Sequence, residues 1–479
     1  MLAGNGGGMT QLPFRSATEL AAAIRGKEIS STELVECYLG RIEALNPGLR
    51  AVVTVAAERA CSEAGEADRR LARGEEVGPL HGLPVTVKDS LETAGMRTTC
   101  GARELAGYVP DHDAEAVGRL RRAGAIIAGK TNLPAWASDC QSYNELFGTT
   151  SNPWDPARTP GGSSGGAAAA VAAGLTSFEL GTDIAGSVRI PAHLCGVFGL
   201  KPSFGVIPQR GYLDHVGGGT TDTDLNVFGP IARDPDDLDL LLGVLAGPEP
   251  ERQTAWRLEL PPPRRTTLEG LRIGLWLEDP RCPMDREVLA VLRAAADRLA
   301  DARARIEQAH PPVGFSHQVG VFNHLLLAAV SPSLPAEAAE AVSGSHLRWL
   351  QADQDRAGLR RVWARWFEDF NLLMCPVLGV AAFPHNHQGQ LIDRVLDVNG
   401  QPAPHLALLG WAGLIGVVGL PSAVAPAGRT AAGLPVGVQL VAPFLRDRDA
   451  VRAARLVSEV LGGYQPPPID TLHHQVPGR

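Results

Sequence analysis

The sequence predicts an α/β fold, with strands and helices alternating along most of the chain. Short apolar runs bounded by glycine and proline recur between stretches of helical periodicity. Two helix-start signatures stand near the N-terminus, ahead of the first apolar run. The 479 residues include 44% hydrophobic and 20% charged residues, which is typical of a globular protein with a large core.

The N-terminal part is expected to be helical. Ser16-Ala17-Thr18-Glu19 and Ser30-Ser31-Thr32-Glu33 match the capping-box pattern, so each predicts a helix start. Asn46-Pro47-Gly48 predicts the end of the second helix, and a third is expected over about residues 56–73. The second helix carries an apolar stripe that should face the core, made of Leu34, Tyr38, Ile42 and Leu45.

The first buried strand is expected to end at Lys88, in His81-Gly82-Leu83-Pro84-Val85-Thr86-Val87-Lys88. A lysine there is either a surface residue with a buried stem or a buried neutral amine that can act as a base. A helix over 114–123 and a strand over 125–128 should follow. Because ligands in open α/β sheets lie beyond the carboxyl ends of strands, the next segment offers either pocket walls or ordinary core residues, namely Leu133, Trp136, Cys140 and Tyr143.

Two glycine-flanked serines, Ser163 and Ser187, lie within residues 159–192. Glycine permits sharp turns and lets main-chain N–H groups approach a reacting oxygen. No lysine follows the glycines after Ser164, so the phosphate-loop pattern is not met. A helix over 165–173 should direct its N-terminus at the first serine, and Ser164 either caps that helix or joins the serine network. A strand over 177–182 and a tight turn over 183–187 should present the second serine.

The second half should continue the α/β rhythm after a proline-rich linker over 248–268. Strands are expected over 271–276, 372–376, 422–426 and 436–441, and helices over 287–302, 346–370 and 448–461. A mostly helical middle region, about 313–371, could cover the mouth of an active site. Residues 406–425 carry no charge and are long enough to span a membrane, but their glycines and Pro421 favour a buried loop and strand.

Composition argues against several functions. A net charge of −8 and the lack of a basic stripe argue against nucleic acid as the main partner. Seven scattered cysteines without a C-x-x-C pair predict a reduced cytoplasmic protein with no zinc site. None of the thirteen histidines has the glycine-turn context of the serines, so a Ser-His-Asp triad is not favoured. No signal peptide is expected at the glycine-rich start, where either Met1 or Met9 could be native.

Taken together, these residues resemble the amidase signature family, including bacterial aryl acylamidases, urethanases and fatty acid amide hydrolase-like amidases. The resemblance covers about residues 20–247 and 419–462. Its motifs are Gly82-Leu83-Pro84-Val85-x-Val87-Lys88-Asp89, Gly129-Lys130-Thr131-Asn132, Tyr143-Asn144-Glu145-x-x-Gly148-x-Thr150-x-Asn152-Pro153-Trp154, Gly161-Gly162-Ser163-Ser164-Gly165-Gly166 and Gly181-Thr182-Asp183-x-x-Gly186-Ser187-x-Arg189-x-Pro191.

The resemblance implies a large central mixed, twisted sheet flanked by helices on both faces. It implies one domain over 13–466, with a signature core at about 80–247 and a variable, mostly helical mouth at about 310–405. Residues 1–12 would be a disordered lead and 467–479 a tail. The implied triad has Ser187 as nucleophile, Ser163 as bridging serine after a cis peptide, and Lys88 as base, with Gly161 and Gly162 at the substrate. The implied oxyanion hole is the main-chain N–H groups of Ile184, Ala185, Gly186 and Ser187.

Two positions depart from the family pattern. Ala185 stands where most members have glycine, which keeps the N–H donor but makes a positive φ costlier. Ala135 stands where an acidic residue is common. Asp89, Asp183 and Arg189 are interpreted as structural supports.

The resulting hypothesis is a cofactor-free serine amidohydrolase that cleaves C–N bonds of small aryl or apolar amides, and also carbamates and esters. Large apolar residues of the middle region suggest an apolar or aryl substrate, although core packing explains them equally well: Phe315, Phe322, Leu325, Trp349 and Trp363. The alternatives are the amidase-like subunit of a tRNA-dependent amidotransferase, or a binding protein on the same scaffold. No membrane partner is expected, and a homodimer is left open.

Overall fold

The computed structural model describes residues 11–469. The predicted lead over 1–12 and tail over 467–479 therefore lie mostly outside the described residues. Where the lead is described, it ends in a short 3-10 helix, η1 (Leu12–Phe14), with Leu12 buried.

An eleven-stranded mixed sheet forms the centre of the molecule, as predicted. Four pairs of neighbouring strands are parallel, namely β2–β3, β2–β6, β9–β10 and β9–β11. The other neighbours are antiparallel. The order across the sheet is β1 (Val52–Val55), β3 (Ile126–Thr131), β2 (Pro84–Lys88), β6 (Glu179–Asp183), β8 (Val227–Ala232), β7 (Phe198–Lys201), β14 (Ser422–Arg429), β15 (Pro435–Val441), β11 (Leu372–Pro376), β9 (Arg272–Leu275) and β10 (Arg305–Glu307).

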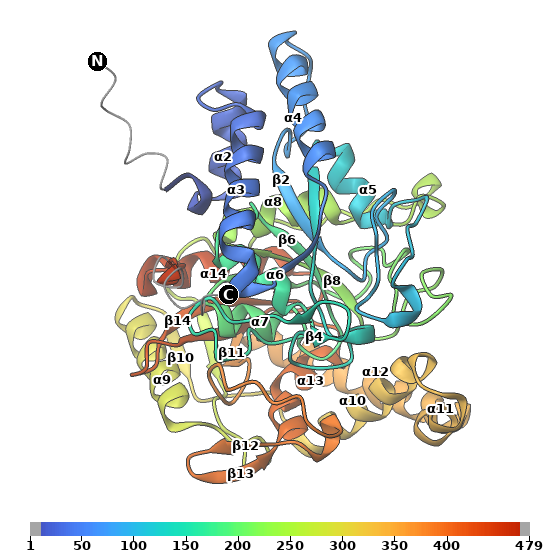
Figure 1. Ribbon diagram of the computed structural model, residues 1–479. Coiled ribbons are helices and arrows are strands. Elements are labelled where there is room, and N and C mark those ends of the chain that lie inside the picture. The colour runs from blue at the N-terminus through green and yellow to red at the C-terminus, as the bar shows by residue number, and fades with distance from the viewer. Residues whose placement is uncertain (1–10, 470–479) are drawn as a thin grey trace.

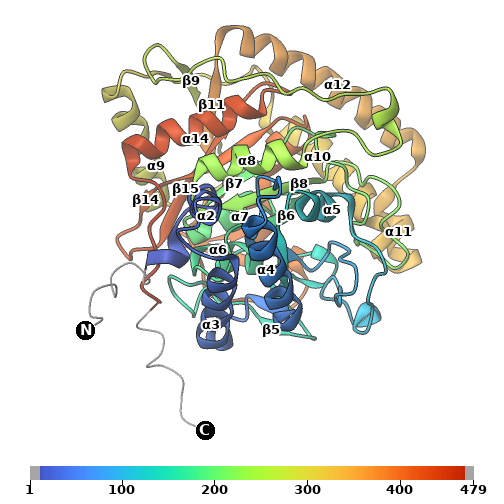
Figure 2. The same cartoon turned by 90° about the horizontal axis from the view of Figure 1, so that it is seen from above.

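Helices cover both faces of this sheet (Figures 1 and 2). Alternate residues of one strand belong to different cores: Leu372 and Met374 of β11 face one side, and Leu373 and Cys375 the other. The first face packs on α2 (Ala17–Arg25), α5 (Glu115–Arg122), α8 (Pro235–Leu245), α9 (Arg286–Asp301) and α14 (Asp447–Leu461). The second packs on α6 (Gly165–Ala172), α7 (Arg189–Cys195), α10 (Phe315–Val330), α12 (His346–Asp369) and α13 (Gly410–Gly416).

Both predicted capping boxes are present. Ser16 starts α2 and Ser30 starts α3 (Ser31–Leu49), each with reciprocal bonds to a glutamate. The predicted end of α3 at residues 46–48 is wrong, because the helix continues through Pro47 to Leu49. Arg50 has a left-handed backbone conformation, and its N–H donates to the Asn46 carbonyl. The Asn46 Oδ1 atom accepts the N–H groups of Ala51 and Val52.

Residues 410–425 are buried, as predicted, whereas Leu406 is exposed, and the expected loop is a helix. The 3-10 helix η7 (His405–Leu409) leads into α13, and β14 follows. The glycines of α13 give close approach to α10: a Cβ at Gly413 would lie 2.5 Å from the ring of Phe322. Within residues 11–469, no helix is both long and apolar enough to cross a membrane.

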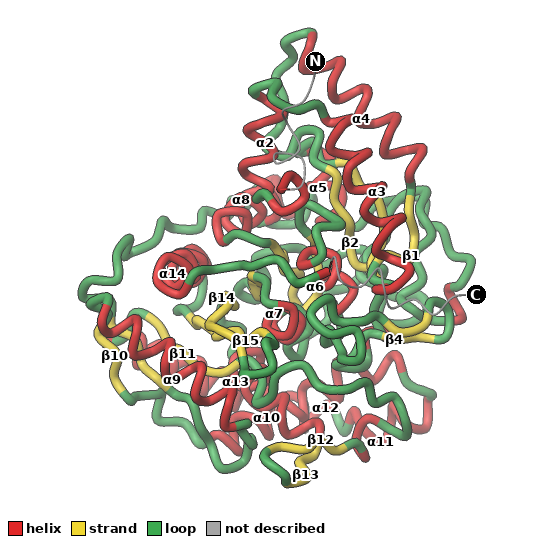
Figure 3. Tube along the Cα trace, turned by 60° about the vertical axis from the view of Figure 1, so that its left-hand side comes forward, coloured by secondary structure: helices red, strands yellow, loops and turns green. Residues whose placement is uncertain are grey.

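The middle region is helical only in its first part. Helices α10, α11 (Ala336–Ser343) and α12 are followed, after β11, by loops and a hairpin of β12 (Val395–Val398) and β13 (Gln401–Pro404). This hairpin lies at the opposite end of the molecule from α3 and α4 (Figures 1 and 3). The remaining elements are α4 (Ala57–Ala72), β4 (Tyr143–Asn144), β5 (Gly148–Thr149), and the 3-10 turns η2 (Arg103–Leu105), η3 (Ala135–Ala137), η4 (Arg252–Thr254), η5 (Ser331–Ser333) and η6 (Leu391–Asp393).

We predict that Gly229→Ala lowers the free energy of unfolding by about 1–3 kcal/mol. A Cβ at Gly229 in β8 would lie 2.1 Å from the Leu200 carbonyl oxygen of the neighbouring strand. Urea-induced unfolding measures the effect. The control is Gly243→Ala in α8, where a Cβ meets nothing within 4 Å and where alanine should stabilise the helix by up to about 1 kcal/mol. Equal stability of the two variants would contradict the prediction.

Candidate active site

Lys88 and Ser163 meet in the interior, although 75 positions separate them in the sequence. Lys88 closes β2 and is fully buried. Its Nζ donates to Ser163 Oγ at 2.6 Å and to Thr182 Oγ1 at 2.8 Å. Burial lowers the pKa of Lys88 to about 7, against the opposing effects of Cys100, Glu179 and Asp183. The amine is therefore neutral for a substantial fraction of the time at neutral pH.

The peptide bond between Gly162 and Ser163 is cis, as the family resemblance implies. The loop around it is tightly bonded. Ser142 Oγ donates to the Gly161 and Ser163 carbonyls at 3.0 and 3.2 Å and accepts the Gly165 N–H at 3.0 Å. Gly162 has no room for a side chain, since a Cβ would lie 2.7 Å from the Asp139 carbonyl oxygen. These contacts hold the hydroxyl of Ser163 against Lys88.

Ser187 lies in the turn between β6 and α7, at the place where the sequence predicts it. It is 8% exposed, so its hydroxyl has limited access to solvent. Within residues 11–469, Ser187 Oγ makes no hydrogen bond, whereas the Ser187 carbonyl accepts the Ser164 N–H at 3.1 Å. The structure thus joins Lys88 directly to Ser163, whereas Ser187 contacts the neighbouring Ser164 through the backbone. Looser hydroxyl contacts are common in active sites without substrate.

Asp183 shapes the turn that carries Ser187. Its carboxylate accepts the N–H groups of Gly186 and Val188 at 2.9 and 3.1 Å, and it forms a fully buried ion pair with Arg189. Burial alone would raise the pKa of Asp183, but Arg189, Lys201 and the Gly186 N–H lower it to about 2. Asp183 and Arg189 are therefore structural supports, as expected from the sequence.

The bond to Asp183 changes the predicted oxyanion hole. The Gly186 N–H is already donated to that carboxylate, which leaves the main-chain donors of Ile184, Ala185 and Ser187. The positive φ of this turn falls on Gly186, at 106°, and not on Ala185. Alanine in place of the usual glycine therefore costs no backbone strain here.

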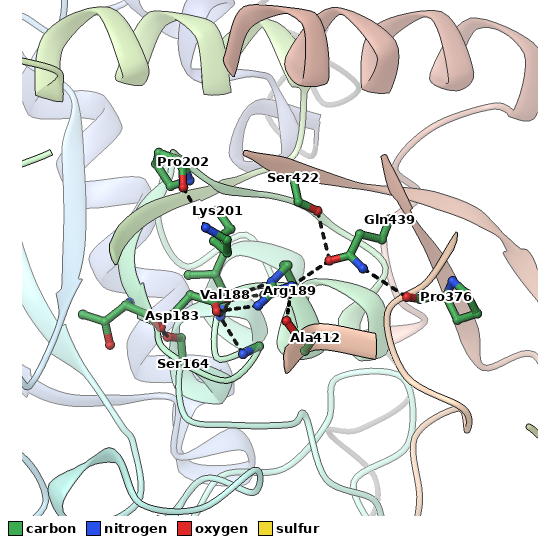
Figure 4. Close-up of polar contacts among 12 residues, drawn as sticks. Ser164, Asp183, Val188, Arg189, Lys201, Pro202, Pro376, Ala412, Ser422 and Gln439 are labelled. Carbon is green, nitrogen blue, oxygen red and sulfur yellow. Dashed lines mark hydrogen bonds and ion pairs between the residues drawn. The ribbon is translucent and has the colours of Figure 1, made fainter. Parts of the chain in front are cut away.

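Gln439 extends this network and was missed at the sequence level. Its Oε1 accepts Arg189 Nη1 at 2.7 Å and Ser422 Oγ at 3.0 Å, and its Nε2 donates to the Pro376 carbonyl at 3.2 Å (Figure 4). The same guanidinium donates to the Ala412 carbonyl of α13 at 3.0 Å. The signal was present, because Gln439 is the lone polar residue of the apolar strand PVGVQLV.

Ser164 and Thr182 also differ from the expectation. Ser164 precedes α6 but its side chain caps no N–H of that helix. Its Oγ instead donates to the Thr182 carbonyl at 3.3 Å and accepts the Thr182 N–H at 3.4 Å. Thr182, which was not singled out, contacts Lys88 directly. The helix-cap interpretation of Ser164 is therefore wrong, because β6 supplies its partners.

Two residues expected to line a pocket, Cys140 and Tyr143, contact residues 385–405. Cys140 Sγ lies 2.9 Å from His405 Nε2, and burial raises the pKa of this thiol. Tyr143 stacks on His387 with ring centroids 3.7 Å apart and donates its hydroxyl to Asp139, which pairs with Arg394. Trp136 is half-buried against a small cluster with Cys100, Leu133 and Leu213. A contact with substrate stays a prediction for Trp136, Cys140 and Tyr143.

Structural contacts within the protein also surround Asp89, the buried His193 and the apolar residues of α10 and α12. Asp89 accepts the N–H and hydroxyl of Thr99, at 3.0 and 2.5 Å. His193 is fully buried in α7, where its Nδ1 accepts the Gly437 N–H at 2.8 Å. The aromatic residues of α10 and α12 form a core with Trp411, which confirms the core interpretation for Phe315, Phe322, Leu325 and Trp363. Within residues 11–469, no group of three metal-ligating side chains comes together.

We predict that Gln439→Leu lowers the free energy of unfolding by about 2–4 kcal/mol, because it removes one acceptor from the buried Arg189 guanidinium and the acceptor of the buried Ser422 hydroxyl. Urea-induced unfolding measures this loss. The control is Gln351→Leu on exposed α12 surface, which should change stability by less than about 0.5 kcal/mol. A similar small change in both variants would mean that Gln439 does not support the ion pair.

Known proteins resemble this chain over most of its length. The family model described as Amidase matches residues 33–334 and 315–451. A Glutamyl-tRNA(Gln) amidotransferase subunit from Thermosynechococcus vestitus is 32% identical over 492 residues, covering 94% of this chain and 98% of that protein. The protein of the same name from Anaeromyxobacter dehalogenans is 34% identical, covering 94% of this chain and 97% of its own length.

Solved structures show the same fold. A bacterial aryl acylamidase of the amidase signature family has a TM-score of 0.81 at 25% identity, covering 97% of this chain and 99% of that one. A 6-aminohexanoate cyclic dimer hydrolase complexed with substrate has a TM-score of 0.79 at 27% identity, covering 95% of this chain and 99% of that one. The family model and the relatives above 30% identity together show that this chain belongs to the amidase family, whose members carry the amidase signature.

Proposed function

We propose that this chain hydrolyses amide C–N bonds through an acyl-enzyme formed on Ser187. The observation that carries the proposal is the buried Lys88 amine at 2.6 Å from Ser163 Oγ, beside the turn that presents Ser187. Membership of the amidase family agrees with C–N bond chemistry. No cofactor is needed, because the residues themselves supply a base, a nucleophile and main-chain donors.

In the proposed mechanism, neutral Lys88 takes a proton from Ser163 as Ser163 takes one from Ser187. Ser187 Oγ attacks the amide carbonyl, and the tetrahedral oxyanion is held by the remaining N–H donors of the turn. When the C–N bond breaks, the proton returns through Ser163 to the leaving amine. Water then attacks the acyl-enzyme by the same route, which releases a carboxylic acid and regenerates Ser187.

The proposed substrates are small aryl or apolar amides. Ile184 and Ala185 pack against the aromatic core that contains Phe322 and Trp411, so the wall of the site next to the oxyanion donors is apolar. The aryl acylamidase and the cyclic dimer hydrolase, at 25% and 27% identity, act on amides according to their names. Carbamates and esters offer the same carbonyl and leaving group. We further propose a cytoplasmic location, and a homodimer stays a prediction.

A second function has stronger support from sequence than the aryl-amide proposal. Relatives 30–34% identical over about nine-tenths of this chain are named as the same subunit of a Glutamyl-tRNA(Gln) amidotransferase. In that function the same serine chemistry would release an amide nitrogen for transfer, and the chain would work with partner subunits and charged tRNA. The net charge of −8 favours tRNA contacts made by a partner rather than by this chain.

We predict that Ser187→Ala reduces amide hydrolysis by at least about 10³-fold and abolishes labelling by a fluorophosphonate probe. The variant removes the only atom that forms the acyl bond in the proposed mechanism. Release of nitroaniline from an aryl anilide measures the rate. Ser138→Ala, at an exposed serine whose hydroxyl donates to the Ala135 carbonyl, is the matched control and should be fully active. A labelled, active Ser187→Ala enzyme would refute the assignment of the nucleophile.

We predict that hydrolysis accelerates as pH rises through the pKa of Lys88, about 7. Lys88 acts as a base only when neutral, so the rate should increase about tenfold between about pH 6 and about pH 8 and then level off. A pH profile of kcat/KM under conditions where the fold is intact measures this. A rate that falls across the same range would contradict the role of Lys88.

The two proposed functions are distinguished by the substrate that the isolated chain hydrolyses. We expect a stand-alone amidase to cleave an aryl anilide or the matching aryl carbamate without any partner. Cleavage of free glutamine, dependent on added partner subunits, would instead support the amidotransferase function. Failure of all three substrates, together with absence of fluorophosphonate labelling at Ser187, would favour a binding protein on this scaffold.

A further inference from the structure

A cavity of about 430 Å³ is lined by none of Lys88, Ser163 and Ser187. It is formed where α12, the proline-rich segment before β9 and the loop after β15 converge. Figure 2 shows this segment passing between α12 and α14. The volume is in the range of sites that hold small organic ligands. The lining residues are Arg264, Arg360, Arg361, Ala364, Phe367, Glu368, Val418, Leu420, Pro443 and Phe444.

The cavity has an excess of positive charge. Arg264, Arg360 and Arg361 face a single lining carboxylate, Glu368. Arg264 is neutralised by Asp449 outside the cavity. In the part of the chain that the structure describes, Arg360 and Arg361 form no ion pair with a carboxylate within 4 Å. Two guanidinium groups are therefore available to an anion.

Arg360 is held in place before any ligand arrives. Its Nε donates to the Val418 carbonyl at 3.2 Å. The adjacent Gly419, at φ 72°, leaves space for the guanidinium, since a Cβ there would lie 3.3 Å from Arg360 Nη2. Partial burial and the nearby Arg356 lower the pKa of Arg360, against the opposing effects of Asp353 and Asp224. A bound anion would relieve this repulsion.

The remaining walls are apolar. Val418 and Leu420 are buried at the base, and Phe367 is 5% exposed on α12. Phe444 is 49% exposed on the loop after β15 and forms part of the rim. An inorganic anion would use the arginines but leave these surfaces in water, whereas an aryl or alkyl group would cover them.

We propose that this cavity binds an amphipathic organic anion, specifically an aryl or acyl carboxylate. The carboxylate pairs with Arg360 and Arg361, and the apolar body packs between Phe367 and Phe444. The site is separate from the amide-cleaving residues, so its occupancy does not depend on the proposed hydrolysis.

Isothermal titration calorimetry with 1-naphthoate on the full chain tests this proposal. We expect saturable binding at one site and at least about tenfold weaker binding by Arg360→Met/Arg361→Gln, because charge-assisted bonds are lost. Arg365→Gln removes the same charge from α12 outside the cavity and should bind normally. The neutral isostere 1-naphthalenemethanol should bind at least about tenfold more weakly than the carboxylate. Phe444→Ala, at an exposed position, should weaken binding without lowering the melting temperature.

The proposal is overturned by any of four results. These are no saturable binding of 1-naphthoate, equal binding of the neutral alcohol, unchanged binding by the double arginine variant, or an equal loss in Arg365→Gln. Binding that survives the double variant but disappears when Ser187 carries a fluorophosphonate would place the ligand at the amide-cleaving site and also overturn it. Melting temperatures of the variants show whether a loss of binding reflects unfolding. If the double arginine variant is unfolded, the folded Phe444→Ala variant decides the question, because normal binding of 1-naphthoate by that variant would overturn the proposal.

Discussion

The buried ion pair between Asp183 and Arg189 is the interaction on which the candidate site depends. Removing both charges from water costs several kcal/mol, so the pair is not a strong argument for stability. Its contribution is geometric. Asp183 accepts main-chain N–H groups on either side of Ser187, and Arg189 reaches α13 and Gln439. The turn is thereby fixed to two other parts of the chain, α13 and β15.

A second constraint is the burial of two lysines at neighbouring strand ends. Lys88 on β2 and Lys130 on β3 are both fully buried, and burial lowers the pKa of each, to about 7 and about 8. Their partners differ. Lys130 donates to the Leu91 carbonyl and to threonine hydroxyls, a closed structural set. Lys88 instead donates to a serine on a glycine-rich loop, which makes its amine available for proton transfer.

The predictions that succeeded rest on local patterns. Capping boxes at Ser16 and Ser30 and the buried strand ending at Lys88 all depend on neighbouring residues, so the sequence alone could indicate them. The predictions that failed depend on distant contacts. The glycines of residues 406–425 predict a loop, but α13 forms there because rings of α10 occupy the space that the glycines leave, Phe322 at Gly413 and Phe315 at Gly410. Of the two roles that the sequence allows for Ser164, capping of α6 is wrong, because its Oγ bonds to the main chain of Thr182 on β6.

By itself, the sequence determined the α/β class, most strands and helices, and the identity of Lys88, Ser163 and Ser187 as a family motif. Only the tertiary structure decided how these residues are placed. It showed that Asp183 already holds the Gly186 N–H and that residues 385–405 contact Cys140 and Tyr143. It also revealed Gln439 behind Arg189. The physical reason is that hydrogen bonds between segments far apart in the chain follow from packing, which no local pattern records.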